Sequence, residues 1–174
     1  MFILNKNKHF DKIIVDFFNR SMADIRELNL LLTPFGAKPF IERDKGMFVL
    51  NTFLYLLFFQ ESALRQKYPP KYQKSVSVVL DALMYQIAER LNYNYHKVQE
   101  AYVRLRKILA NLAEDEEAAK VGLYYGPAVS YLLTTFTGEY NPENVGIYDG
   151  RVEFALANFF QRVMRDNMVY LDLE

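Results

Sequence analysis

The chain has 174 residues, of which 51% are hydrophobic and 16% aromatic, and its 21 basic and 21 acidic side chains give a formal net charge of zero. This composition excludes an intrinsically disordered chain, and a neutral chain is not expected to have a polyanion as its main partner. Because cysteine is absent, disulfides and thiolate metal sites are excluded.

The first part of the chain predicts two helices separated by a loop. Apolar side chains recur at helical spacing over residues 9–32, and two prolines and two glycines break the pattern over residues 33–46. Residues 47–66 are apolar on nearly every face, which is typical of a helix buried among other elements. The apolar run at 47–59 has 13 residues, whereas a membrane span needs about 20. We therefore predict a buried helix and no membrane segment.

The middle of the chain predicts two amphipathic helices after a sharp break. The segment YPPKY, residues 68–72, ends the preceding helix, because Pro69 and Pro70 fix φ and lack a backbone donor. It is the candidate boundary between two subdomains. Apolar stripes at helical spacing then predict helices over 74–91 and 95–113.

The last part of the chain predicts a short buried helix over 126–136, a second long loop over 137–150 and a final helix over 151–167. The terminal segment MVYLDLE, residues 168–174, alternates apolar and polar side chains, which indicates a short strand or an ordered tail. We predict an all-α fold for the single domain 1–174. Its expected form is an irregular bundle of about six helices around the 47–66 helix, with two long loops.

Residues 86–107 resemble the helix-turn-helix family of DNA-binding proteins over about 20 residues. Ile87 and Ala88 stand where that motif packs its first helix, Asn92 stands in its turn, and Val98 stands where the second helix returns to the core. The resemblance implies that the second helix presents side chains able to reach bases and phosphates, namely His96, Lys97, Gln99, Glu100 and Arg104.

A second interpretation explains the same residues as the corner of an ordinary helical hairpin. The apolar stripes of both helices are long, the turn has no glycine, and an acidic run follows the second helix. Two long antiparallel helices joined by a tight corner account for these features. We therefore favour the hairpin and keep a DNA-binding regulator as the alternative.

Motifs for catalysis or metal binding are absent from the sequence. The two histidines, His9 and His96, belong to none of the spacings typical of metal sites, and there is no glycine-rich phosphate loop or nucleophile elbow. Glu61, at the end of the apolar helix, is the candidate for a partly buried carboxylate. The aromatic residues of 47–59 either form plain core or line a cavity for a hydrophobic ligand. We expect a non-enzymatic protein without a cofactor or metal.

Charge and tyrosine content point to a partner surface in the C-terminal part. Residues 1–107 hold 17 Lys/Arg against 10 Asp/Glu, a net charge of +7, and residues 108–174 hold 4 against 11, a net charge of −7. An acidic run could be the solvated first turn of a helix, and tyrosines could cap the core. As a partner surface, both would suit a basic protein. The candidate partner-binding residues are Glu114, Asp115, Glu116, Glu117, Tyr140, Tyr148 and Asp149.

These observations favour a protein whose function is to bind another protein. An inhibitor or immunity-type protein that neutralises a toxin or effector would fit, as would an adaptor, and we expect a monomer or a homodimer. The first residues, MFILNKNKHFDK, lack the pattern of a signal peptide, so the expected location is cytoplasmic.

Overall fold

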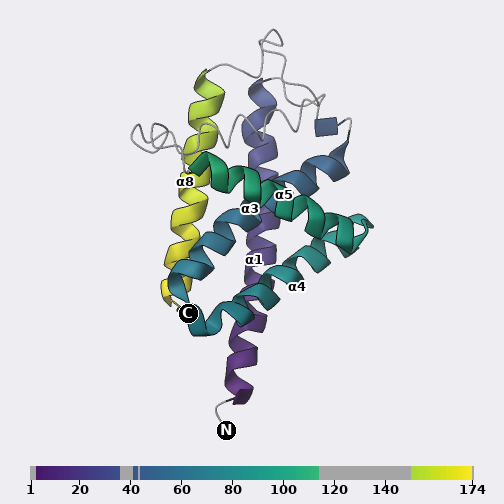
Figure 1. Ribbon diagram of the computed structural model, residues 1–174. Helices are drawn as coiled ribbons and strands as arrows, with labels where there is room; N and C mark the ends of the chain where they lie inside the picture. Colours follow the sequence, from purple (N-terminus) through teal and green to yellow (C-terminus); the bar gives the residue numbers. More distant parts are fainter. Residues whose placement is uncertain (1–2, 36–40, 43, 114–149, 174) are drawn as a thin grey trace.

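The computed structural model describes residues 3–35, 41–42, 44–113 and 150–173, and every regular element in these ranges is a helix (Figure 1). The predicted all-α class is confirmed. The described α-helices are α1 (Ile3–Leu32), α3 (Lys45–Lys67), α4 (Gln73–Leu91), α5 (Tyr95–Ala113) and α8 (Gly150–Leu173). Two short 3-10 turns are also described: η1 (Thr33–Phe35) follows α1, and η2 (Pro70–Tyr72) lies between α3 and α4.

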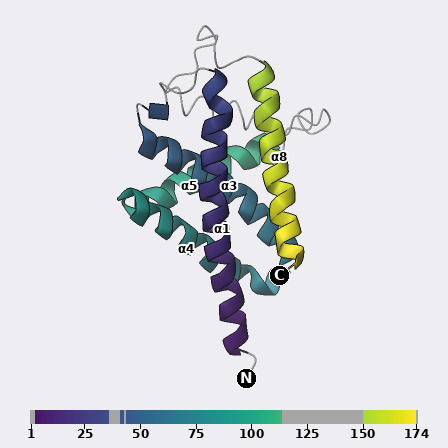
Figure 2. The same cartoon turned by 180° about the vertical axis from the view of Figure 1, so that it is seen from behind.

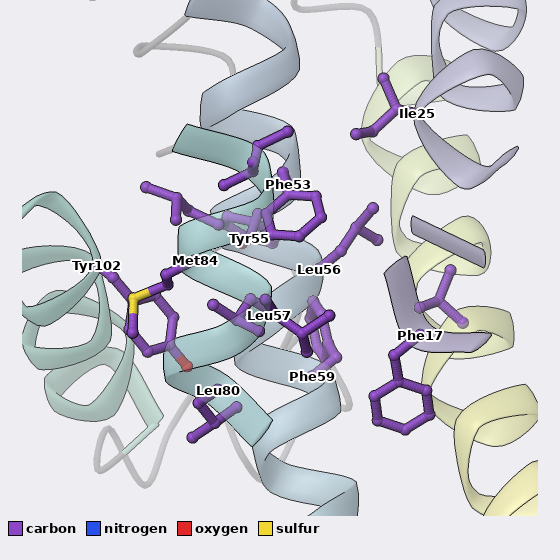
Figure 3. Close-up of a cluster of buried hydrophobic side chains, with 14 of the residues drawn as sticks. Phe17, Ile25, Phe53, Tyr55, Leu56, Leu57, Phe59, Leu80, Met84 and Tyr102 are labelled. Atoms are coloured by element: carbon purple, nitrogen blue, oxygen red, sulfur yellow. The ribbon is translucent and has the colours of Figure 1, made fainter. Parts of the chain in front are cut away.

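Helix α3 packs against α1, α4, α5 and α8. Thirteen of its residues are buried, between Phe48 and Leu64, because apolar side chains occupy nearly every turn of the helix on all sides. Phe53 and Leu57 are fully buried, whereas Phe58 is partly buried at the edge of the core. Figure 3 shows the side chains of α3 meeting those of α1, α4 and α5 in one apolar cluster.

Among the described helices, α3 is also long and apolar enough to cross a membrane when judged by length and composition alone. In the folded chain, 72% of that apolar stretch is buried inside the protein. One of its buried polar side chains joins it to α1: the amide nitrogen of Gln60 donates to the carbonyl of Phe17 and to the hydroxyl of Ser21.

Helices α1 and α8 lie side by side and cover one side of α3 (Figure 2). Aromatic side chains fill this interface. The ring of Phe160 on α8 packs 4.8 Å from the ring of Tyr55 and 5.4 Å from that of Phe59, measured between centroids. The ring of Phe17 on α1 lies 5.6 Å from that of Tyr170.

The prediction of a strand or tail at residues 168–174 is wrong, because α8 continues to Leu173. Tyr170 and Leu171 are buried, and they extend the helical spacing of the buried positions Val163 and Asn167. Packing against the long helix α1 therefore decides the conformation, although the sequence alternates.

Local structure fixes the two ends of α3. Tyr68 ends α3 in an extended conformation, with φ −101° and ψ 122°, as expected for a residue that precedes proline. The segment Pro70–Tyr72 then makes a 3-10 turn into α4. Within the predicted loop 33–46, Asp44 caps α3 by accepting a hydrogen bond of 2.9 Å from the backbone N–H of Met47.

Several predicted segments lie outside the described residues. They are residues 36–40 and 43 of the first loop, the short helix predicted over 126–136, and the second loop up to Asp149. Gly150 begins α8.

Candidate functional site

A cleft of about 760 Å³ lies between α4 and α5. The two helices diverge from their corner, and α3 crosses behind the opening between them (Figure 1). The lining therefore comes from three helices: Glu61 and Arg65 from α3, Leu80 and Met84 from α4, and residues of α5 along one side.

The corner that separates α4 from α5 is built by two asparagines. Asn92 adopts the left-handed conformation, with φ 56° and ψ 41°, which asparagine tolerates better than most residues. The backbone N–H of Tyr93 donates to the carbonyl of Ala88 (2.9 Å), and that of Asn92 donates to the carbonyl of Glu89 (3.2 Å). The side chain of Asn94 then accepts from the backbone N–H of Lys97 and caps α5.

Asn92 bears directly on the resemblance to a helix-turn-helix. The missing glycine counts against that motif in the sequence, yet Asn92 supplies the left-handed conformation that a glycine would provide. The turn chemistry therefore does not separate the hairpin from the helix-turn-helix. The helix lengths favour the hairpin, because α4 and α5 have 19 residues each and the hairpin interpretation expects two long helices.

The floor of the cleft holds a buried carboxylate, Glu61, which is 4% exposed. The hydroxyl of Tyr102 donates to Glu61 Oε2 (2.5 Å), and the Nε of Arg65 donates to Oε1 (2.6 Å). A nitrogen of Arg106 lies 3.4 Å from the same Oε1. Both oxygens of the carboxylate are thus engaged, which offsets the cost of removing its charge from water.

Tyr102 is buried beside Met84 and Leu80 and reaches inward from α5 (Figure 3). Burial, followed by the negative charge of Glu61, raises the pKa of Tyr102 well above its usual range. The hydroxyl therefore stays protonated and acts as a donor to Glu61 at any physiological pH.

The charges that line the cleft are balanced. The lining contains three arginines, Arg65, Arg104 and Arg106, and three carboxylates, Glu61, Asp81 and Glu100. The apolar part of the lining comes from Leu80, Met84 and Val103. Val103 lines the cleft and is 64% exposed.

Four of the five side chains that the helix-turn-helix resemblance would present to DNA line this cleft: His96, Gln99, Glu100 and Arg104. Lys97 is exposed but does not belong to the lining. The amide of Gln99 is held by the hydroxyl of Tyr95 (2.6 Å) and lies 3.4 Å from the carboxylate of Asp81.

His96, Glu100 and Arg104 follow one another at a spacing of four residues on α5, so they share one face of the helix. This row carries a carboxylate at its centre. A surface that reads DNA needs cations toward the phosphates, and the central carboxylate weakens such a surface.

The residues proposed for the acidic partner surface, Glu114–Glu117, Tyr140, Tyr148 and Asp149, lie outside the described residues. Three other tyrosines from predicted loops or helix ends, Tyr68, Tyr93 and Tyr95, are partly buried and pack against the core. The imidazole of His9 lies within hydrogen-bond distance, 2.6 Å, of the Tyr68 hydroxyl.

The sequence did not single out Tyr102, Arg65 or Arg106 as site residues. Two signals were available: Glu61 and Arg65 stand four residues apart on one helix, and Tyr102 is the one hydroxyl-bearing residue in the apolar stripe of 95–113. Neither signal shows that the two helices meet, because that contact depends on tertiary packing.

The described ranges contain no group of three or more His, Asp or Glu side chains arranged to hold a metal ion. Comparisons of this chain with models of protein families, with curated proteins and with solved structures give no match.

Proposed function

We propose that this chain is a non-enzymatic protein-binding protein and that the α4–α5 cleft receives a short segment of its partner. The observation that carries the proposal is the cleft itself, about 760 Å³ in volume, with apolar side chains and charges of both signs along its walls. Grooves between two helices commonly receive an amphipathic segment of another protein, whose apolar face enters the groove.

The exposed valine supports a protein ligand. Val103 is exposed to water in the free protein. Its burial under an apolar side chain of the partner would contribute hydrophobic free energy to binding. The balanced charges around it favour a segment with both acidic and basic side chains over a polyanion.

The Glu61 cluster supports a preformed site. Because both oxygens of Glu61 are occupied, its role is to hold the guanidinium groups in place. Arg65 donates from Nε to Glu61 and from a terminal nitrogen to the side-chain oxygen of Gln73. Arg106 is 51% exposed and meets Glu61 through a single nitrogen, so its other donors can bind a carboxylate of the partner.

Two matched valine variants test the proposal. Val103→Asp puts a charge into the cleft, whereas Val78→Asp puts the same charge on α4 at a position that is 57% exposed and does not line the cleft. Tagged proteins would be expressed in the cells that naturally make the chain, and the proteins recovered with each would be quantified by mass spectrometry. We expect a partner that is recovered with wild type and with Val78→Asp and at least tenfold less with Val103→Asp. Equal recovery with both variants would contradict the cleft as the binding site.

The inhibitor, immunity-type and adaptor functions expected from the sequence fall within this proposal, as do a cytoplasmic location and a monomeric or homodimeric state. We also propose the finer organisation of the fold: about six helices in one domain, with α3 at the centre. The DNA-binding alternative predicts a sequence-selective duplex that binds at nanomolar concentration and is lost in the double variant Lys97→Ala/Arg104→Ala. Finding one would replace the present proposal.

A further inference from the structure

A second cleft, of about 510 Å³, lies where the C-terminal half of α1 meets the start of α3 and the end of α4. Its inner wall is apolar: Ile25, Ile41 and Phe48 are buried, and Met22 and Val49 are partly buried. The volume falls within the range of about 300–1,000 Å³ that is typical of small-molecule pockets.

Three cations from three helices surround this apolar wall: Arg26 on α1, Lys45 on α3 and Arg90 on α4. Within the described part of the chain none of the three forms an ion pair. Glu42 is the one acidic side chain in the described lining, so the cleft carries a positive excess. This distinguishes it from the α4–α5 cleft, where the charges cancel.

Lys45 is the first residue of α3, and the carboxylate of the preceding Asp44 already accepts the backbone N–H of Met47. The start of the helix is therefore already capped by an acidic side chain. The attraction for an anion in the cleft comes from the side chains of Arg26, Lys45 and Arg90.

We infer that this cleft binds a small amphipathic anion, a free molecule with an apolar body that carries one carboxylate, sulfonate or phosphate group. The apolar body would lie against Ile25, Phe48 and Val49, and the anionic group would lie toward Arg26, Lys45 and Arg90. The side chains of Asn29 and Thr33 are the neutral polar groups at the α1 edge. This inference does not depend on the function of the α4–α5 cleft.

Two probes of nearly the same shape test the inference on the full chain. The first is 1-anilinonaphthalene-8-sulfonate, and the second is N-phenyl-1-naphthylamine, which lacks the sulfonate. Fluorescence titration should give saturable binding of the anionic probe at one site, about tenfold or more tighter than the neutral probe. The triple variant Arg26→Gln/Lys45→Gln/Arg90→Gln should weaken the anionic probe at least tenfold and change the neutral probe less than twofold.

Two further variants locate the site. Lys97→Gln removes one exposed cation outside the lining and should leave both probes unchanged. Val49→Trp fills the cleft and should weaken both probes; circular dichroism establishes that each variant is folded. The inference is overturned if the two probes bind equally well, or if the triple variant binds the anionic probe as wild type does. Binding to vesicles of anionic phospholipid without saturable binding of the soluble probe would also overturn it.

Discussion

The two sides of α3 are built by different means. Toward α1 and α8, contacts are dominated by aromatic rings, such as those of Phe53, Tyr55 and Phe160. Toward α4 and α5, the same helix presents Glu61, whose carboxylate is buried under Tyr102 and two arginines. The side toward α1 and α8 is therefore mainly apolar next to α3, with Gln60 as a neutral polar contact, and the side toward α4 and α5 holds the buried carboxylate of α3.

This difference supports the proposed binding cleft on the α4–α5 side. Rings and leucines at an interface stabilise the fold through burial and can often be exchanged for others of similar volume. A buried ion pair adds little net stability, and a set of apolar residues in its place is often equally stable or more so. The charged cluster therefore supports the proposal that the α4–α5 cleft is a binding site.

The largest effect is expected on the aromatic side. Phe53 is fully buried, and its ring lies 5.6 Å from that of Phe18 on α1. Phe53→Ala should lower the free energy of unfolding by about 3–5 kcal/mol, because it leaves a cavity as well as removing apolar contact. Urea denaturation measures the change. The exposed Phe154, replaced by alanine, should change it by less than about 0.5 kcal/mol. Equal losses in the free energy of unfolding for the two variants would contradict the assignment of Phe53 to the core and of Phe154 to the surface.

On the charged side, Tyr102→Phe removes the hydroxyl that donates to Glu61. We expect a loss of about 1–3 kcal/mol, since a buried carboxylate oxygen is left without its donor. The double variant Glu61→Leu/Tyr102→Phe removes both partners and should be closer in stability to wild type than Tyr102→Phe alone. A double variant that is less stable than Tyr102→Phe would show that the charged cluster contributes to stability. That result would contradict the contrast drawn between the two sides of α3.

One carboxylate on the α1–α8 side, Asp24, makes the stability of the protein depend on pH. Burial outweighs the nearby Arg162 guanidinium and raises the pKa of Asp24 to about 6. Because this value lies above the unfolded value of 3.8, the stability linked to protonated Asp24 is fully present below about pH 3.8 and is lost as the pH rises through about 6.

Asp24→Asn should therefore be more stable than wild type by about 1–2 kcal/mol at pH 7.5, with the difference shrinking toward pH 4. Unfolding curves between pH 4 and pH 8 test this expectation. Asp11→Asn, on the exposed face of α1, is the control for loss of one negative charge. If the stability difference between Asp24→Asn and wild type grows as the pH falls, the pKa of Asp24 is not raised in the folded state.

The smallest effect concerns the corner between the helices of the cleft. Asn92→Ala should cost about 1 kcal/mol, because alanine tolerates the left-handed conformation less well than asparagine. Asn92→Gly should be neutral or slightly stabilising, since glycine adopts this conformation without strain. Thermal unfolding of the two variants checks the order, and a more stable alanine variant would contradict it.

Helical periodicity predicted much of the fold because the apolar stripes are long. The expected helix 74–91 is Gln73–Leu91, and the expected helix 95–113 is Tyr95–Ala113. The end of α8 was missed because MVYLDLE alternates at a period of two, and its contact with α1 is not visible in local sequence. A pattern within one segment specifies which face is apolar but not which helix covers it.

The candidate site was harder to predict for the same reason. The sequence indicated Glu61 as a carboxylate at the end of an apolar helix. Its donors are Tyr102, 41 residues further along the chain, and Arg65 in the same helix. Residues of the hairpin were considered as an outward surface for DNA, whereas His96 and Arg104 line a cleft with α3 behind it. The packing of three helices, which periodicity does not specify, creates the cleft.

Photo-crosslinking at two positions of the hairpin tests most directly whether a partner protein binds in the α4–α5 cleft. The photoreactive residue p-benzoylphenylalanine replaces either Val103, in the cleft, or Val78, outside it; both positions are exposed, so the fold should accept the substitution. After irradiation in the cells that naturally express the chain, adducts are identified by mass spectrometry. We predict a covalent adduct with one partner protein from position 103 and none from position 78. Adducts of equal yield from both positions, or none from position 103, would contradict the assignment of the α4–α5 cleft as the partner-binding site.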